Sequence, residues 1–315
     1  MSNARIMFVV HRYAPFPGGS EYYVRDMAEE CVRRGYDVTV LAHEHQGDLN
    51  GVKVTNDYNI LNQRWNLIVV HGGDVISQNI VHANAYALRK TPVVYMIIKP
   101  SESEICYNGL KHHRFIAYST SVDINHIKKF GYLNKARRIR HGMNVGQTVK
   151  PKVKYPKTTF VSAGGFWPNK AMVPLAQEFI HANIPNTELH LYGYHPGEMP
   201  PNTSNVKVFL GKPKDEVAQA IASADAYIMN SYDEGFGLVL LEAMMNKTPW
   251  YARNIAGAKD MSSYGKIYDN ESELMLMLMK FKRVDKEIED SYNYVMANHT
   301  IEQTVNDIED ILWEI

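Results

Sequence analysis

Cysteine is scarce in this sequence, with two residues, Cys31 and Cys106, among 315. Two thiols cannot cross-link a chain of this length, and their spacing does not match a metal-binding pair. The scarcity excludes a disulfide-stapled scaffold and a zinc–cysteine site. It favours a reducing cytoplasm as the compartment of the protein.

Long hydrophobic runs are also missing. The longest, residues 93–98, has the length of a β-strand, whereas a membrane-spanning helix needs about 18–20 apolar residues. The apolar stretch at residues 6–10 is too short for the core of a signal peptide. The sequence therefore predicts no transmembrane segment, and any membrane attachment would be peripheral, through a basic surface at the inner face of a membrane.

The chain carries no net charge, because 34 basic residues balance 34 acidic ones, but the two signs are unevenly placed. Residues 1–157 contain 22 basic and 12 acidic residues, and the remainder contains 12 basic and 22 acidic residues. No acid occurs between residues 124 and 157. Either the basic half meets an anionic partner, or its charges form a solvated face and help the two halves to dock.

Apolar strands and amphipathic helices alternate along the chain, and the alternation starts twice. Continuous apolar strands of this kind indicate a parallel sheet covered by helices on both faces. A stretch rich in proline and lysine, residues 150–157, separates the two runs. We therefore predict an α/β protein with two Rossmann-like, doubly wound domains, over residues 1–149 and 158–315, and a ligand cleft between them.

The last helix carries its own capping signal. Thr300 and Gln303 have the spacing of a capping box, and four apolar residues lie on one face of the helix that follows, namely Ile301, Val305, Ile308 and Leu312. Such a face must be buried. The helix could pack back on the first domain, although its sequence position assigns it to the second.

The most informative segment is residues 231–244, with the sequence SYDEGFGLVLLEAM. It predicts a strand end, a glycine turn and a helix start. Gly235 and Gly237 let the backbone approach a ligand closely, and the amides of Phe236, Gly237 and Leu238 point out of the start of the helix. Such a turn is an anion site that suits a diphosphate.

Glu234 and Glu242 flank this turn with an E-x7-E spacing, and a carboxylate accepts hydrogen bonds from sugar hydroxyls. The segment resembles the signature of the retaining family-4 glycosyltransferases of the GT-B fold. Residues 209–211, 222–226 and 247–249 match the family's order and spacing on both sides. The resemblance implies that Glu234 contacts the donor sugar, that Glu242 contacts the ribose and that the amides of the turn bind the diphosphate.

A second element, residues 164–170 with the sequence GGFWPNK, looks like the family's other phosphate-binding loop, which usually carries an arginine and a lysine. Lys170 stands at the position of the family's lysine, and the resemblance implies that it binds the donor and takes part in catalysis. Gly165, a donor-loop position, stands where the arginine is expected. Either another cation replaces the arginine, or donor binding and leaving-group stabilisation are weaker in this chain.

In the first domain, residues 16–21 resemble the Gly-Gly loop that precedes the first helix of the family. Ser20 is a plausible N-cap of that helix. The resemblance implies that this loop approaches the acceptor through three residues, Gly18, Gly19 and Ser20. Gly19 is also expected to approach the phosphate of the donor.

His71 ends a predicted strand, at the position where the family has a histidine beside the sugar. The resemblance implies that His71 hydrogen-bonds the donor sugar or stabilises charge in the transition state. His11 also ends a strand and competes for that role.

No metal or cofactor is expected. The sequence has no D-x-D after a strand, and the histidine-rich residues 111–114 lack ligand spacing and are flanked by cations. In the family that the chain resembles, cations and helix dipoles stabilise the leaving diphosphate. Retention then implies front-face attack, with the leaving phosphate accepting the proton of the acceptor.

The sequence thus predicts a metal-independent, retaining glycosyltransferase that uses a nucleotide-diphosphate sugar, and it leaves the nucleotide, the sugar and the oligomeric state open. The basic first domain favours an anionic acceptor, such as a lipid phosphate, a phosphorylated glycan or nucleic acid. One alternative is a phage-type enzyme that glycosylates hydroxymethylated DNA bases, although no nucleic-acid module is recognisable. Another is a degenerate nucleotide-sugar binding protein, because of Gly165; an epimerase of this fold carries different acids.

Overall fold

The computed structural model describes residues 4–16, 18–72, 88, 91–98, 113–151, 154–194 and 197–315. Cys106, residues 111–112 and two residues of the expected linker, 152 and 153, lie outside this part of the chain. The chain divides into two compact units, of which the first contains residues 1–144 and 299–315 and the second contains residues 145–298.

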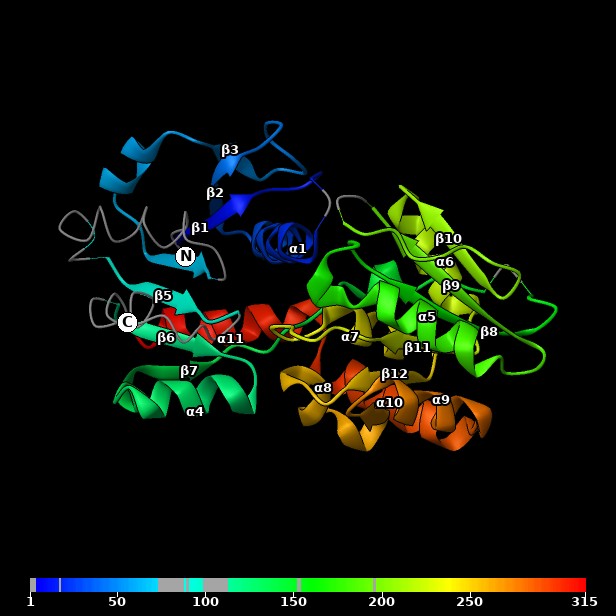
Figure 1. The fold of residues 1–315 in the computed structure, drawn as a ribbon. Coiled ribbons are helices and arrows are strands. Elements are labelled where there is room, and N and C mark those ends of the chain that lie inside the picture. The colour runs from blue at the N-terminus through cyan, green and yellow to red at the C-terminus, as the bar shows by residue number, and fades with distance from the viewer. Residues whose placement is uncertain are drawn as a thin grey trace. The chain divides into compact units, whose positions relative to one another are not determined.

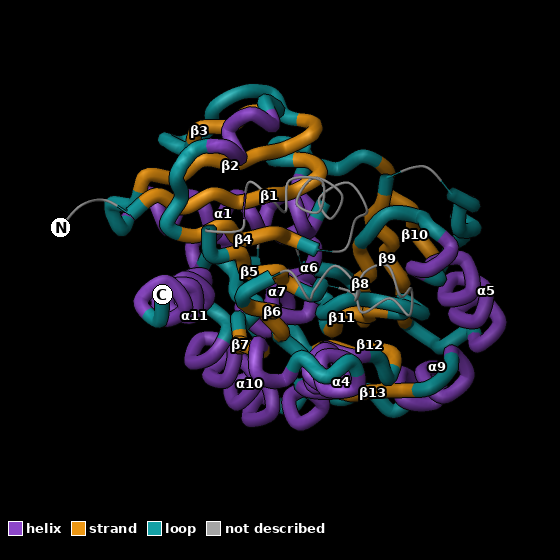
Figure 2. The backbone as a smooth tube through the Cα atoms, turned by 90° about the vertical axis from the view of Figure 1, so that its left-hand side faces the viewer, coloured by secondary structure: helices purple, strands orange, loops and turns teal. Residues whose placement is uncertain are grey.

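The first unit is built on a parallel sheet of seven strands in the order β3-β2-β1-β4-β5-β6-β7 (Figure 2). The strands are β1 (Arg5–Arg12), β2 (Asp37–Glu44), β3 (Lys53–Thr55), β4 (Leu67–His71), β5 (Val93–Met96), β6 (Phe115–Tyr118) and β7 (Ala136–Arg138). Its described helices are α1 (Gly19–Arg33), α4 (Ser121–Lys129) and α11 (Ile301–Trp313). Helix α1 buries Tyr23, Met27 and Cys31, as its helical spacing predicts.

The second unit contains a parallel sheet of six strands in the order β10-β9-β8-β11-β12-β13. The strands are β8 (Thr158–Ala163), β9 (Thr187–Gly193), β10 (Val206–Leu210), β11 (Ala226–Met229), β12 (Trp250–Arg253) and β13 (Lys266–Tyr268). The helices are α5 (Met172–Ala182), α6 (Lys214–Ser223), α7 (Leu238–Met245), α8 (Ala256–Asp260), α9 (Glu271–Met279) and α10 (Asp285–Asn298) (Figure 1). The α/β prediction with two parallel sheets is confirmed.

Each sheet reverses its strand order once, between β1 and β4 in the first unit and between β8 and β11 in the second. At such a switch point the loops leave the carboxyl ends of the two strands in opposite directions, which opens a place for a ligand. The loops that follow β8 and β11 carry the two phosphate-binding elements expected from the sequence. The fold therefore brings residues 164–170 and 230–237 to one edge of one sheet.

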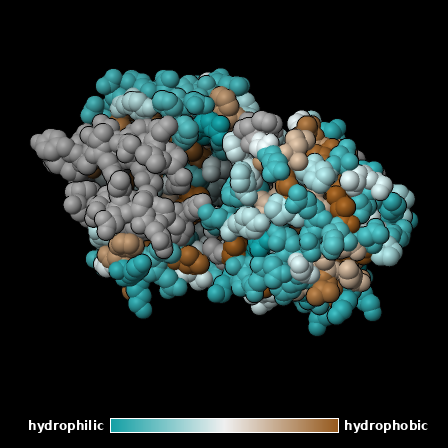
Figure 3. Space-filling view, in the orientation of Figure 1, coloured by the Kyte–Doolittle hydropathy of each residue, from teal (hydrophilic) through white to brown (hydrophobic). Residues whose placement is uncertain are grey.

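Hydrophobic residues reach the surface of the second unit in separate small patches among hydrophilic ones (Figure 3). Several large side chains are exposed, including Trp167, Tyr194, Tyr232, Leu276 and Met279. No helix in the described ranges is long and apolar enough to cross a membrane.

Helix α11 belongs to the first unit, the arrangement that the sequence analysis left open. The capping box of Thr300 and Gln303 is present, with the Thr300 amide donating to Gln303 Oε1 at 2.9 Å. The four apolar residues of its predicted face are buried. Arg140, which follows β7, binds α11 to the rest of the unit. Its backbone amide and its Nε both donate to Asp307 Oδ2, at 2.8 and 2.9 Å.

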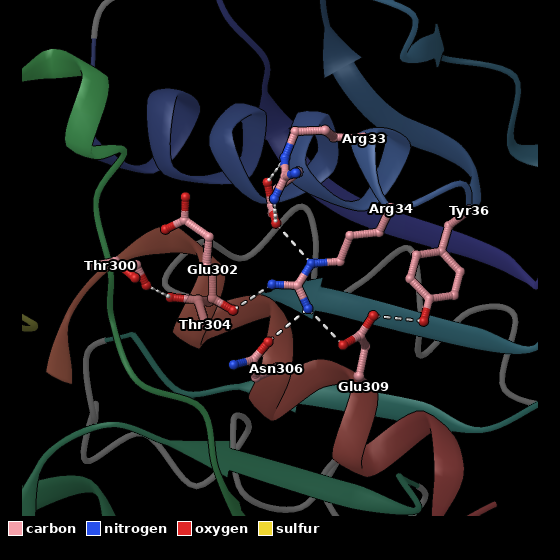
Figure 4. Close-up of polar contacts among 9 residues, drawn as sticks. Arg33, Arg34, Tyr36, Thr300, Glu302, Thr304, Asn306 and Glu309 are labelled. Atoms are coloured by element: carbon pink, nitrogen blue, oxygen red, sulfur yellow. Dashed lines mark hydrogen bonds and ion pairs between the residues drawn. The ribbon is translucent and has the colours of Figure 1, made fainter. Parts of the chain in front are cut away.

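A second arginine, Arg34, joins α11 to the end of α1 (Figure 4). Its guanidinium donates to Glu309 Oε2 at 2.6 Å, to Asn306 Oδ1 at 2.7 Å and to the Glu302 carbonyl at 2.8 Å, while its Nε donates to Glu30. The neighbouring Arg33 pairs with Glu30 within α1.

We expect Arg34→Ala to lower the free energy of unfolding of the first unit by about 1–3 kcal/mol, because it leaves the half-buried Glu309 without its cation. Arg33→Ala is the matched control and should cost less than Arg34→Ala, since Arg33 is exposed, its pair lies within one helix and Glu30 keeps its contact with Arg34. Calorimetry of both variants makes the comparison. Equal losses would mean that Arg34 does not hold α11 in place.

Candidate functional site

The candidate site lies where β8 and β11 pair at the switch point of the second sheet. Residue Ala226 of β11 pairs with Phe160 of β8, and Tyr227 pairs with Val161. The loop after β8 turns at Gly164 and Gly165, and the loop after β11 leads through Gly235 into α7.

The glycine turn before α7 has the conformation that its sequence predicts. Gly237 is the N-cap of α7 and is left-handed, with φ 91° and ψ 57°. A side chain there would be strained, and its Cβ would lie 2.9 Å from Met229 Sδ. The amides at the start of a helix have no acceptor within the helix, and the helix dipole adds a partial positive charge. The turn before Leu238 therefore has the backbone of an anion site.

Lys170 and Glu234, 64 residues apart in the sequence, form an ion pair between the two loops. Ser231 Oγ donates to the same carboxylate oxygen, Glu234 Oε1, at 2.9 Å. The backbone also joins the loops, because the Tyr232 amide donates to the Asn169 carbonyl at 2.8 Å. The structure thus brings together the lysine and the carboxylate for which the sequence predicts donor binding.

Asn230, which the sequence analysis did not single out, lies at the centre of the contacts that hold this site. Its buried amide nitrogen donates to the Ala171 carbonyl at 2.9 Å and to Glu271 Oε1 at 3.0 Å, and the Tyr268 hydroxyl donates to its Oδ1 at 2.9 Å. Arg253 Nε donates to its carbonyl at 3.1 Å. A polar residue directly after an apolar strand was the available signal.

Arg253 braces the second loop from the end of β12. Its guanidinium pairs with Glu271, donates to the Asp269 carbonyl at 2.7 Å and lies 4.5 Å from the ring centre of Tyr232. The contact with the ring holds Tyr232, which lies two residues before Glu234 in the sequence.

Trp167 explains why position 165 is a glycine. A side chain at Gly165 would place its Cβ 2.5 Å from both Cδ1 and Nε1 of the Trp167 indole and 3.4 Å from Cζ of Tyr194. The aliphatic stem of Lys170 covers the neighbouring Gly164, whose Cβ position lies 3.8 Å from Lys170 Cδ. The indole therefore occupies the space into which an arginine at position 165 would have to extend.

Glu242 lies one turn inside α7. Its burial raises the pKa of its carboxyl group, and Lys214 opposes the shift. The buried Tyr227 hydroxyl, which donates to the Ala163 carbonyl at 3.0 Å, has a raised pKa because of its burial, and the charges of Glu242 and Glu234 add to the shift. The negative charges of both glutamates of the E-x7-E pair therefore act on the Tyr227 hydroxyl.

In the first unit, His71 ends β4 and is buried. Tyr23 of α1 lies between two histidines, with ring centres 6.2 Å from His71 and 4.9 Å from His141. Burial lowers the pKa of His141 to about 3, and His71 and His299 add to the shift. His11, the competing candidate, lies instead beside His43 and 3.8 Å from Glu44.

The glycine loop of the first unit differs from the prediction in one respect. Helix α1 begins at Gly19 with Gly18 as its N-cap, so Ser20 lies inside the helix and is not its cap. The Glu21 carboxylate explains the glycine, because it occupies the place of a Cβ at Gly18. Glu21 pairs with Arg12 at 3.0 Å, and its burial raises the pKa of its carboxyl group.

Among the described residues, no group of three or more histidines, cysteines, aspartates or glutamates could hold a metal ion.

Residues 157–290 match the family described as Glycosyl transferases group 1. No curated protein matches the sequence. The matched residues lie within the second unit, whose sequence is therefore similar to that family.

Solved structures resemble the whole chain. HepE from Anabaena, in a complex with UDP-glucose, has a TM-score of 0.79 at 14% identity and covers 99% of this chain and 100% of its own. A glycosyltransferase from Rickettsia africae has a TM-score of 0.79 at 13% identity, with coverages of 100% and 99%. Sucrose-phosphate synthase from Thermosynechococcus elongatus has a TM-score of 0.76 at 14% identity, with coverages of 99% and 98%. The protein has the GT-B fold.

We expect Gly165→Arg to lower the free energy of unfolding by about 1–3 kcal/mol, because its side chain collides with the Trp167 indole. The double variant Gly165→Arg/Trp167→Ala removes the collision and should recover most of that loss. Thermal unfolding of both variants and of Trp167→Ala tests the coupling. If the double variant merely adds the two single losses, the indole does not exclude a side chain at position 165.

Proposed function

We propose that this protein is a retaining, metal-independent glycosyltransferase that takes a sugar from a nucleotide-diphosphate donor bound by its second unit. The observation that carries the proposal is the Lys170–Glu234 pair, held at the switch point of a unit whose sequence is similar to the group 1 family. HepE, which shares the fold, has a structure with UDP-glucose, and uridine nucleotides are therefore the first donors to test.

The donor contacts follow from the chemistry of the two loops. The diphosphate binds at the start of α7, on the amides of Phe236, Gly237 and Leu238, where the dipole favours negative charge. Lys170 adds a full positive charge, and its pairing with Glu234 keeps it at the site before the donor arrives. Glu234 then accepts from the sugar hydroxyls and Glu242 from the ribose.

The first unit supplies the acceptor loop through Gly18, Gly19 and Ser20, with Gly19 near the donor phosphate and His71 at the sugar. The basic character of residues 1–157 supports an anionic acceptor. The leaving phosphate carries the charge that develops in the transition state, and Lys170 and the α7 dipole stabilise it. The proton of the attacking hydroxyl passes to that phosphate.

The packing of Trp167 on Gly165 supports one second candidate, a protein that binds the nucleotide sugar without transferring it. Loss of an arginine from a phosphate site removes bidentate contacts that a single lysine does not replace. Donor binding without hydrolysis or transfer, across a panel of acceptors, distinguishes this candidate from the enzyme.

We expect Lys170→Ala and Glu234→Gln each to lower the turnover of UDP-glucose by about a hundredfold, because each removes a group that stabilises the donor. Lys247→Ala is the control, since Lys247 forms an exposed pair with Glu289 at 2.6 Å in the same unit. Release of UDP, measured without metal and with Mg²⁺, reports turnover by transfer or by hydrolysis. Near-normal rates in both site variants would sink the proposal.

Glu242→Gln should weaken nucleotide binding and stabilise the free protein at neutral pH. A carboxyl whose pKa is raised by folding favours the folded state at low pH, and that contribution is lost as the pH rises through its folded pKa. Replacing the Glu242 carboxyl with the neutral amide of glutamine removes this loss of stability at higher pH. Thermal unfolding at pH 5 and pH 8, with and without UDP, tests both effects; a variant less stable than wild type at pH 8 would contradict them.

A further inference from the structure

A hollow of about 230 Å³ lies on the second unit beside the two loops of the candidate site. Its walls include Trp167 and Pro168 from the loop after β8, Val173 and Pro174 from the start of α5, and Tyr232 from the loop after β11. Glu198 contributes a carboxylate to the same walls. The glycines and amides of the α7 turn, where we place the diphosphate, are not among its lining residues.

We propose that this hollow binds one pyranose ring of a glycan, as a saccharide subsite separate from the donor site. The inference rests on the proposed function, because it assigns the ligand class from sugar transfer at the adjoining loops. The rest of the argument comes from the walls of the hollow.

The two aromatic walls expose apolar surface to water, which is energetically unfavourable. Trp167 is 42% exposed and Tyr232 is 49% exposed, although both are large side chains with apolar faces. Neither ring fills the core of the unit. Flat aromatic faces beside one carboxylate match a pyranose, whose C–H face packs on a ring while its hydroxyls donate to an acceptor such as Glu198.

Both rings come from segments whose backbone is held before any ligand arrives. Pro168 follows Trp167 and restricts it to an extended backbone, with φ −78° and ψ 150°, and the glycine at position 165 leaves room for the indole. Tyr232 lies over the Arg253 guanidinium, and its amide is bound to the Asn169 carbonyl. Walls held in this way lose little conformational freedom on binding, which favours affinity.

The size and position of the hollow limit its occupant. Pockets for drug-sized ligands have volumes of about 300–1,000 Å³, so that 230 Å³ suits a single ring. The turn Pro168–Lys170 joins the hollow to Lys170, and Tyr232 lies two residues before Glu234. A sugar held here therefore adjoins the loops that hold the donor, as expected for a unit of a bound glycan chain.

Saccharide binding to the full chain tests the proposal, with maltotetraose, cellotetraose and chitotetraose as probes. Saturation-transfer NMR detects contact, and NMR titration gives the affinity. We expect at least one probe to bind, and Trp167→Ala and Tyr232→Ala each to weaken it about tenfold in the NMR titration. Trp313→Ala, which removes an exposed tryptophan of the first unit, should leave binding unchanged.

Binding of UDP, measured in parallel, separates this proposal from the proposed function. Saccharide binding that is lost in the two wall variants, with UDP binding retained, supports the subsite. If none of the three probes binds to wild type, or if Trp167→Ala abolishes UDP binding instead, the hollow is not a saccharide subsite. If UDP binding is lost in Lys170→Ala and Glu242→Ala but saccharide binding is kept, the two sites are separate and both proposals are supported. If wild type binds saccharide but no nucleotide, the donor site is contradicted and the saccharide subsite is not.

Discussion

The buried amide of Asn230 is the contact on which the candidate site depends. It joins the start of α5, the start of α9 and the end of β13 to the loop that carries Glu234. Without this contact, the two loops at the switch point would be joined by the backbone bond from Tyr232 to Asn169 and by the ion pair of Lys170 and Glu234, whose side chains are partly exposed to water. A buried, fully hydrogen-bonded side chain holds a fixed geometry where a surface pair does not. The loops are therefore positioned before a ligand binds, as catalysis by electrostatic stabilisation requires.

Packing also explains how the chain departs from the family that it resembles. The indole of Trp167 and a side chain at position 165 compete for the same space, so that the glycine and the tryptophan belong together. The same indole forms a wall of the adjoining hollow. The glycine at position 165 thus leaves the expected phosphate loop without its arginine and leaves room for the exposed ring of Trp167, which changes what this part of the sheet can bind.

Local features were predictable from the sequence, and long-range ones were predictable only in part. The capping box of Thr300 and Gln303 and the buried face of α11 follow from spacing over a few residues. The approach of Lys170 to Glu234 spans 64 residues and was expected only through the resemblance, because it needs the pairing of β8 with β11. The contacts of Asn230 with Tyr268 and Arg253 leave no pattern in the sequence, since three separate strands must align to make them. The N-cap of α1 was misplaced because the helix begins at Gly19, so that Gly18, which has no side chain to form a capping hydrogen bond, takes the N-cap position in place of Ser20.

Amide hydrogen exchange with and without nucleotide tests the central claim most directly, because it locates the donor without requiring an acceptor. Saturating UDP, GDP and ADP are compared on the full chain. The account predicts that at least one of them slows exchange in both loops, residues 164–171 and 235–240, while β13 at the far edge of the sheet is unchanged. Unchanged exchange in both loops with all three nucleotides, or protection confined to another part of the chain, would contradict a donor site at this switch point.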